Sequence, residues 1–386
     1  MMSRLKEVCW LFLKLGATAF GGPVAHIAMM EEEVVTKRRW MSREHFLDLI
    51  GATNLIPGPN STEMAIHCAY HRAGWLGLIA GGVCFIFPAV TLTLLLAVIY
   101  YQYGSLPAIA PFFIGIRPVM LALIVSAIIK LGKKAVKNYT LGIIGGVTAM
   151  AVIAGVSEIT AILAGGVIGM LVLMRAGKGA SANLFAATPG LIFLQKNMPL
   201  WAAVVPVLPQ KMITLPGIFA VFFKIGMVLF GSGYVLIAYL QGELIDKLHW
   251  ISQQELLDAV AIGQFTPGPV LSTATFIGYQ LNGINGAIMA TVGIFLPAFI
   301  LVAAINPLIP LLRRSPWSAA FLDAVNVSSI GVMAAVVIKL AVNVLINWQA
   351  ALIAVLGIAF VVFLKKASSG WLILLGGLLG YLLNFS

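Results

Sequence analysis

A long apolar segment that is interrupted by glycine and proline occurs twice in this chain. The segment Phe12–Ala89 returns as Phe222–Ala298, and its tripeptide Pro57-Gly58-Pro59 returns 210 positions later as Pro267-Gly268-Pro269. Further pairs at the same spacing are Lys14 with Lys224, Glu33 with Glu243, Trp40 with Trp250 and Asp48 with Asp258. A doubled and interrupted segment in an apolar chain is typical of secondary transporters.

The composition identifies the kind of protein in which this repeat must fold. Of the 386 residues, 61% are hydrophobic and 10% are charged, whereas soluble domains carry about 25% charged residues. We therefore expect a polytopic membrane protein. The net charge of +11 fits either the cytoplasmic excess of Lys and Arg in membrane proteins or the attraction of an anionic substrate. The basic residues lie in short loops between apolar runs, so we expect no nucleic-acid partner.

The apolar runs predict the fold. A spanning helix needs about 20 apolar residues. Four candidate runs follow the first tripeptide and four follow the second: Trp75–Tyr101, Ala108–Ile129, Leu141–Val156 and Ile159–Met174, then Ala287–Leu312, Ala319–Ile346, Ala350–Leu364 and Trp371–Leu383. We expect an all-α membrane protein with an inverted-topology tandem repeat, in which two broken helical hairpins precede about four apolar helices in each half.

The broken hairpins are predicted from glycine and proline. Gly21-Gly22-Pro23 interrupts Val8–Met30, and Pro57-Gly58-Pro59 interrupts Phe46–Tyr70. Proline removes a backbone donor and clashes with the preceding turn, and a break at membrane depth is tolerated where it lines a cavity or is buried in protein. The alternative for each stretch is a spanning helix with a proline kink.

The basic residues predict the topology. The positive-inside rule places the loops at 37–43, 72, 130–137, 175–178, 313–314 and 365–366 in the cytoplasm. The repeat partner of the Arg72 loop, near Gly283, carries no Lys or Arg, so the halves are expected to insert in opposite orientations. We expect a first repeat at 1–178, a linker at 179–217 and an inverted second repeat at 218–386. Parity requires one extra crossing in the linker region, with Leu184–Phe219 as its best candidate.

Three cations in apolar segments are candidate substrate ligands. Lys14 and Lys224 are repeat partners, and a charged side chain at the bilayer centre costs about 2.5–3.5 kcal/mol on insertion scales. They can face a central anion site, or they can extend to the interface. Arg117 stands in the middle of an apolar run, where it contacts substrate or pairs with Asp323 or Asp48. For the partners Glu33 and Glu243 we favour a solvated or intra-repeat ion pair.

The breaks supply a second set of candidate ligands. Amides at a helix N-terminus bind oxyanions, and short hydroxyl or amide side chains there act as donors or as plain N-caps. The glycines of the breaks, Gly22, Gly58 and Gly268, are candidates through their backbone. The polar candidates beside the breaks are Asn54, Asn60, Ser61 and Thr62 in the first half, and Gln264, Thr266, Ser272 and Thr273 in the second half.

Three further residues are candidates for proton coupling. Glu63 and His67 are four residues apart and share a helical face, and His26 follows the first glycine break. Histidine titrates near neutral pH. The alternative is that these histidines are satisfied core residues.

The strings Phe20-Gly21-Gly22-Pro23-x-Ala25-His26-Ile27 and Asn54-Leu55-Ile56-Pro57-Gly58-Pro59-Asn60-Ser61-Thr62-Glu63 resemble the chromate ion transporter family in its long-chain, two-repeat form. The resemblance implies a bacterial inner-membrane protein that exports chromate, driven by the membrane potential or a proton gradient, and that gives chromate resistance. In the second copy, Gly231-Ser232-Gly233 replaces the first glycine–proline string and neither Asn nor Glu follows Pro269, so the halves are not expected to be equivalent.

The expected substrate is chromate, and sulfate or another tetrahedral dianion is the alternative because it has the same shape and charge. An intramembrane enzyme that acts on lipid through Glu63, His26 and His67 is a weaker alternative, since an enzyme does not need two equivalent half-sites. A structural membrane protein leaves the three intramembrane cations unexplained. The chain shows no P-loop, HExxH, GxSxG or CxxC motif, so we expect no enzymatic site, no metal and no cofactor. The lipid bilayer is an expected partner, and a homodimer is a further alternative.

Overall fold

The chain folds as a set of helices. The computed structural model describes residues 2–19, 22–53, 56–103, 110–176, 213–230, 233–305, 316–363 and 369–383, and no β-strand occurs within these ranges. Asn54, Arg313, Arg314, Lys365 and Lys366 lie outside the described residues, as does the linker from 177 to 212. The extra crossing expected in Leu184–Phe219 therefore stays a prediction.

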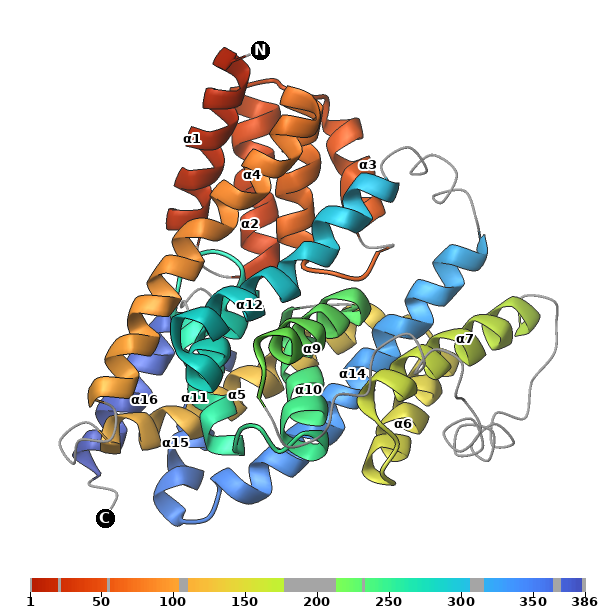
Figure 1. The fold of residues 1–386 in the computed structure, drawn as a ribbon. Helices are drawn as coiled ribbons and strands as arrows, with labels where there is room; N and C mark the ends of the chain where they lie inside the picture. The colour runs from red at the N-terminus through yellow and green to blue at the C-terminus, as the bar shows by residue number, and fades with distance from the viewer. Residues whose placement is uncertain are drawn as a thin grey trace.

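The two halves contain matching helices in the same order (Figure 1). The first half contains α1 (Met2–Thr18), α2 (Gly22–Glu31), the π-helix η1 (Glu32–Lys37), α3 (Arg43–Thr53), α4 (Asn60–Tyr103), α5 (Ala110–Ala135), α6 (Tyr139–Ile153) and α7 (Glu158–Ala176). The second half contains α9 (Leu215–Val228), η3 (Gly233–Val235), α10 (Leu236–Leu240), the π-helix η4 (Gln241–Lys247), α11 (Gln253–Phe265), η5 (Val270–Ser272), α12 (Thr273–Ile305), α14 (Pro316–Val344), α15 (Trp348–Phe363) and α16 (Ser369–Leu382).

The glycine–proline strings end helices, as the sequence predicts. At the first string α1 ends at Thr18 and α2 begins at Gly22, which has a φ of +80°. At the tripeptides, Gly58 has a φ of +144° and Gly268 a φ of +88°, values that glycine adopts without the steric cost of a Cβ. The proline-kinked helix is thus excluded at these strings.

A second interruption divides α4 and α12. Ala73 and Gly74 are non-helical within α4, and Asn282 and Gly283 occupy the equivalent place in α12. The sequence predicts a loop at Arg72, whereas the structure has a sharp kink. The part of α4 before this kink is about 20 Å long at 1.5 Å per residue. It is therefore shorter than the hydrocarbon core of about 30 Å, and with α3 it forms a helical hairpin around Pro57-Gly58-Pro59.

The repeat extends to unusual backbone detail. In each half a π-helix is followed by a non-glycine residue with positive φ, namely Arg39 at +51° and His249 at +54°. The amide of Trp40 donates to the carbonyl oxygen of Val34, and that of Trp250 donates to Leu244, each over 2.8 Å. Such agreement indicates that both copies fold by the same local rules.

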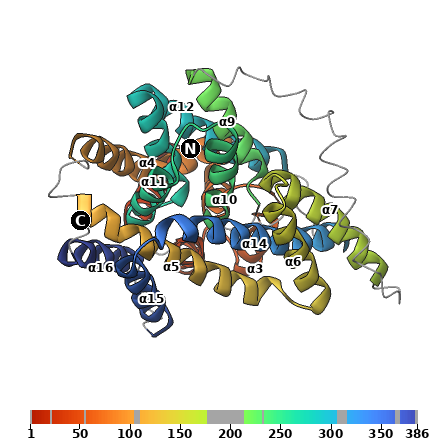
Figure 2. The same cartoon turned by 90° about the horizontal axis from the view of Figure 1, so that it is seen from below.

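The later helices of each half pack on helices of the other half. Helix α5 lies against α15 and α16, and α14 lies against α6 and α7 (Figure 2). Small residues allow the close approach: a Cβ on Gly115 would strike Gly376 and Gly380, and one on Gly331 would strike Gly145. The two halves therefore form one interlocked body.

The length and surface of the helices are those of a multi-pass membrane protein. Among the described residues, five helices are long and apolar enough to cross a membrane, and they correspond to α4, α5, α7, α12 and α14. Along α4, Trp75, Ile79, Val83 and Phe87 recur every four residues and are 51–59% exposed, as a lipid-facing stripe requires. Beyond their kinks, α4 runs to the lower left of Figure 1 and α12 to the upper right. The orientation of each half in the bilayer stays a prediction.

Candidate functional site

The two tripeptides cross over between the halves. The amide of Gly58 donates to the carbonyl oxygen of Leu229 over 2.7 Å, and the amide of Gly268 donates to the carbonyl oxygen of Ala19 over 2.9 Å. Leu229 lies 210 positions after Ala19, so each bond is the repeat counterpart of the other. Each break is thereby tied to the end of the first helix of the opposite half.

Both central glycines are required by close packing as well as by φ. A Cβ on Gly58 would overlap the carboxyl group of Glu63, and a Cβ on Gly268 would lie 2.9 Å from Ala89 Cβ and 3.0 Å from the carbonyl oxygen of Gly16. Real Cβ contacts are rarely this short. The backbone of each tripeptide is therefore held against its neighbours without intervening side-chain atoms.

The first break is lined by buried polar side chains. Ser61, Thr62 and Glu63 are at most 2% exposed, and the amides of Thr62 and Glu63 donate to Pro59. Neither the Thr62 hydroxyl nor either oxygen of Glu63 has a hydrogen-bond partner among the described residues. Buried polar groups without partners are rare in folded proteins, so this cluster is a candidate site for a proton or a ligand. Asn60 begins α4 beside it.

The second break contains hydroxyl groups that are already bonded. Thr266 Oγ1 donates to the carbonyl oxygen of Gly263 over 3.0 Å, accepts from Thr93 Oγ1 over 3.4 Å and lies 3.5 Å from Ser272 Oγ. Thr273 Oγ1 donates to Val270 over 2.8 Å. Gln264 Nε2 is buried without a partner among the described residues. The two breaks are thus chemically different.

His26 contacts the crossover. Its Nε2 donates to the carbonyl oxygen of Ala19 over 3.1 Å, the same oxygen that accepts the amide of Gly268. The imidazole is 1% exposed, and its ring meets Phe85 edge-on. The predicted proton-coupling residue in α2 therefore lies next to the tripeptide of the other half.

Lys14 and Lys224 each pair with a glutamate of their own repeat. Lys14 Nζ lies 3.4 Å from Glu33 Oε1, and Lys224 Nζ lies 2.7 Å from Glu243 Oε1. The intra-repeat ion pair favoured for the two glutamates is confirmed. A role for Lys14 and Lys224 in substrate binding stays a prediction.

Arg117 pairs across the halves. Its guanidinium bonds both oxygens of Asp258, with N–O distances of 3.0 and 2.9 Å, and Tyr100 donates to the same carboxylate over 2.7 Å. The prediction that Arg117 pairs with Asp323 or Asp48 is therefore wrong. Asp323 pairs with Lys137 over 2.7 Å instead. Helix α5 packs on α11, and this contact brings Asp258, the repeat counterpart of Asp48, to the arginine.

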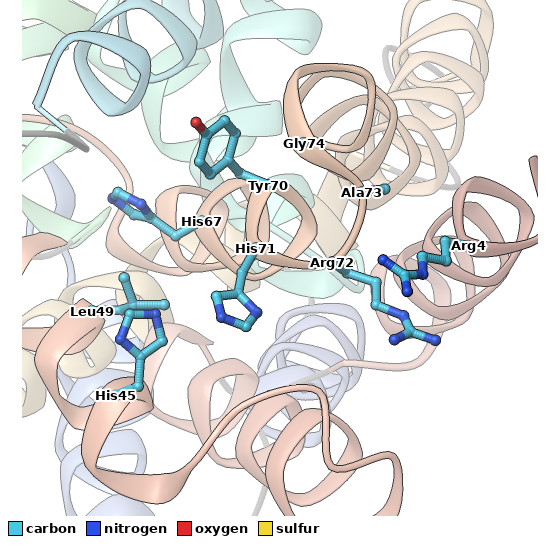
Figure 3. Close-up of a pocket in the computed structure, with 9 residues that line it drawn as sticks. All are labelled: Arg4, His45, Leu49, His67, Tyr70, His71, Arg72, Ala73 and Gly74. Carbon is cyan, nitrogen blue, oxygen red and sulfur yellow. The ribbon is translucent and has the colours of Figure 1, made fainter. Parts of the chain in front are cut away.

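A basic pocket opens at one end of the first half (Figure 3). Its volume is about 760 Å³, and it is lined by Arg4, His45, Leu49, His67, Tyr70, His71, Arg72, Ala73 and Gly74. The rings of His45 and His71 lie 5.0 Å apart between centroids. Of these residues the sequence singled out His67 as a site residue. His71, four residues further along α4, could have been found by extending the spacing of Glu63 and His67, whereas Arg4 and His45 join only through packing.

Comparison with known proteins gives the family. The family model described as "Chromate transporter" matches residues 6–170 and again 217–381. The chain is 30% identical over 383 residues to a chromate transport protein of Cupriavidus metallidurans, an alignment that covers 97% of this chain and 92% of the relative. It is 31% identical to a probable chromate transport protein of Synechococcus elongatus, covering 87% and 84%, and 31% identical to a chromate transport protein of Pseudomonas aeruginosa, covering 86% and 79%. No solved structure matches. Both halves of the chain thus match the same family model, and the chain belongs to the chromate transporter family.

Proposed function

We propose that this chain is a secondary transporter that exports chromate across the bacterial inner membrane and thereby gives chromate resistance. The observation that carries the proposal is the reciprocal crossover, in which Gly58 bonds Leu229 and Gly268 bonds Ala19. Broken helices that meet between two repeats are the place where secondary transporters bind substrate. We propose chromate as the substrate because relatives of this chain are named chromate transport proteins.

In this proposal the two halves are inverted in the membrane. The α3–α4 hairpin reaches its break from the end that carries Arg43 and Arg72, and the α11–α12 hairpin reaches its break from the opposite face. The substrate then lies between the breaks near the bilayer midplane. Its proposed ligands are the side chains of Asn60, Ser61, Thr62, Ser272 and Thr273, together with Gly22, Asn54, Gly58, Gln264, Thr266 and Gly268. Lys14 and Lys224 contribute positive potential.

Glu63 is the proposed coupling group, with His67 and His26 as its neighbours on the proton route. Its carboxyl group is fully buried, has no described partner and touches Gly58. A carboxyl group in such surroundings is stable when protonated and needs a cation or solvent when ionised. Proton release from Glu63 therefore changes the packing of the first tripeptide, and this links the proton to the substrate site.

The test is chromate flux in proteoliposomes. Wild-type protein is expected to move chromate above the rate of empty liposomes and to respond to an imposed pH gradient. Glu63→Gln is expected to retain chromate–chromate exchange and to lose the response to the gradient. Asp323→Asn, which alters a carboxylate paired with Lys137, is the matched control and should behave as wild type. Absence of chromate flux by the wild type would contradict the proposed function, and an unchanged gradient response in Glu63→Gln would contradict the coupling role.

A further inference from the structure

The basic pocket is built by three helices that are separate in sequence. Arg4 comes from α1, His45 from α3, and His71 and Arg72 from the end of α4 before its kink. Figure 3 shows the rings of His45 and His71 side by side, with the two arginines at the other side of the pocket. Guanidinium and imidazole N–H groups are the donors that proteins use for carboxylate, phosphate and other oxyanions.

Among the described residues, the two arginines of the pocket outnumber the one carboxylate that is seen to bond them, that of Glu7. Arg72 donates to Glu7 Oε2 over 2.7 and 3.2 Å, and Arg38 also bonds Glu7, over 3.3 Å. Arg72 and Arg4 together carry one more positive charge than Glu7 neutralises. The rings of His45 and His71, whose centroids lie 5.0 Å apart, add imidazole N–H donors beside this excess charge. The pocket is therefore suited to an oxyanion.

The pocket leads toward the crossover. His71, His67 and Glu63 recur every four residues and so share one face of α4. His71 is exposed at the rim, His67 is 1% exposed in the pocket wall, and Glu63 is fully buried. Glu63 touches Gly58, whose amide bonds Leu229. A polar face thus runs from the pocket to the first tripeptide.

The second half lacks this set of cations. The repeat counterparts of Arg4, His45, His67, His71 and Arg72 are Thr214, Glu255, Phe276, Gln280 and Leu281. Glu255 is a carboxylate that accepts the amide of Ser252 in a capping box. An oxyanion is therefore attracted at one end of the pseudo-symmetric molecule and meets no equivalent cations at the other.

We infer that the pocket formed by Arg4, His45, His67, His71 and Arg72 is the loading site for a tetrahedral oxyanion with two negative charges, on the side from which substrate is taken up. The inference rests on the proposed function and adds to it the side and the residues of first contact. By the positive-inside rule this side is the cytoplasm, because Arg38 and Arg39 lie in the neighbouring loop and Arg43 begins α3 directly after it. Cargo captured here passes along α4 to the crossover.

The test measures the concentration dependence of chromate transport by wild type and by the double variant His45→Gln/His71→Gln, in vesicles of known orientation. The variant is expected to raise KM about tenfold, equivalent to about 1.4 kcal/mol of lost binding, and to keep the maximal rate, when chromate is presented to the pocket side. His249→Gln, a histidine of the second half outside the pocket, is the matched control. Size-exclusion profile and melting temperature check folding, and His71→Gln, at an exposed position, is the second variant should the double variant be unstable.

The outcomes separate a failure of the proposed function from a failure of the loading site. If the wild type moves no chromate, the proposed function fails. If the wild type moves chromate but KM is the same in all variants, or rises equally from both sides, the loading site is overturned. Vesicles of phosphatidylcholine alone and with phosphatidylglycerol distinguish a free oxyanion from a lipid headgroup: a KM rise in both supports the inference, and a rise confined to anionic lipid contradicts it.

Discussion

The amide of Gly58 bonds the carbonyl oxygen of Leu229 over 2.7 Å, and so joins the break of the first half to the first helix of the second. The counterpart bond from Gly268 to Ala19 is 2.9 Å long. Each bond ties the break of one half to the end of the first helix of the other half.

Replacing the glycine of this bond should damage the crossover. Gly58→Ala introduces both an unfavourable φ, at a cost of about 1–3 kcal/mol, and an overlap with the Glu63 carboxyl group. We expect a lower melting temperature and loss of chromate flux in proteoliposomes. Gly155→Ala is the control, since Gly155 has a φ of +98° but open space at its Cβ position. Equal behaviour of the two variants would show that packing against Glu63 is unimportant.

Arg117 is expected to stabilise the fold through Asp258. Removing one partner of a buried pair typically costs about 3–5 kcal/mol, so Arg117→Ala should strongly lower the free energy of unfolding in detergent. The double variant Arg117→Leu/Asp258→Leu should recover much of this loss because no unpaired charge remains. Chromate flux by the stable double variant would support a purely structural role. A stable double variant that does not transport would instead assign Arg117 to the substrate.

The two lysine–glutamate pairs should differ in their contribution to stability. Without Lys14, Glu33 keeps Arg38 at 3.3 Å and Lys37 at 3.5 Å, and the loss is expected to be at most about 1 kcal/mol. Without Lys224, Glu243 keeps only the more distant Lys247, at 3.7 Å, among the described residues.

Lys224→Ala is therefore expected to cost about 1.5–3 kcal/mol, because the pair is also less exposed than the one formed by Lys14. Thermal unfolding of the two alanine variants compares them directly. Flux measured on the same samples tests the proposed electrostatic role. Wild-type KM and rate in both variants would remove the two lysines from the substrate site.

The Glu7 network predicts a dependence on pH at the pocket end. Burial raises the pKa of the Glu7 carboxyl group, but hydrogen bonds from Arg72, Trp40 and Arg38 outweigh it and hold the pKa below its usual value. A lowered folded-state pKa means that the stabilisation is complete above the unfolded-state pKa of about 4.3 and is lost as pH falls through the folded-state pKa. Wild type should thus melt above Glu7→Gln at pH 7, and the difference should shrink in acid. A difference that is constant with pH would contradict the charge-based account.

The inverted orientation predicts opposite labelling of matched positions. Lys37 and Lys247 are repeat counterparts with side chains that are 56% and 58% exposed. In a background without Cys9, Cys68 and Cys84, Lys37→Cys should react with an impermeant thiol reagent from the cytoplasmic side and Lys247→Cys from the other. Their similar exposure makes reactivity comparable. Reaction of both from one side would reject the inversion.

The sequence predicted the helices and their breaks because both depend on nearby residues. Apolar runs and the glycine–proline strings decide where the backbone can form i to i−4 hydrogen bonds. Helices α5, α14 and α16, and the part of α4 after its kink, follow the predicted runs closely. The kink at Gly74 was expected only as a loop, since two non-helical residues within an apolar run leave little signal. The doubled pattern, the all-α membrane class and the family resemblance were likewise present in the sequence.

The tertiary structure decided which distant groups meet. Arg117 bonds Asp258 and Gly58 bonds Leu229, pairs that are 141 and 171 positions apart, and neither is implied by local spacing. The pocket of Arg4, His45 and His71 arises in the same way. The reason is physical. Helix formation is fixed by bonds within a few residues, whereas the packing of α5 and α14 on helices of the opposite half depends on how whole helix surfaces fit together. The sequence by itself determined what each half is made of, and packing determined how each half completes the other.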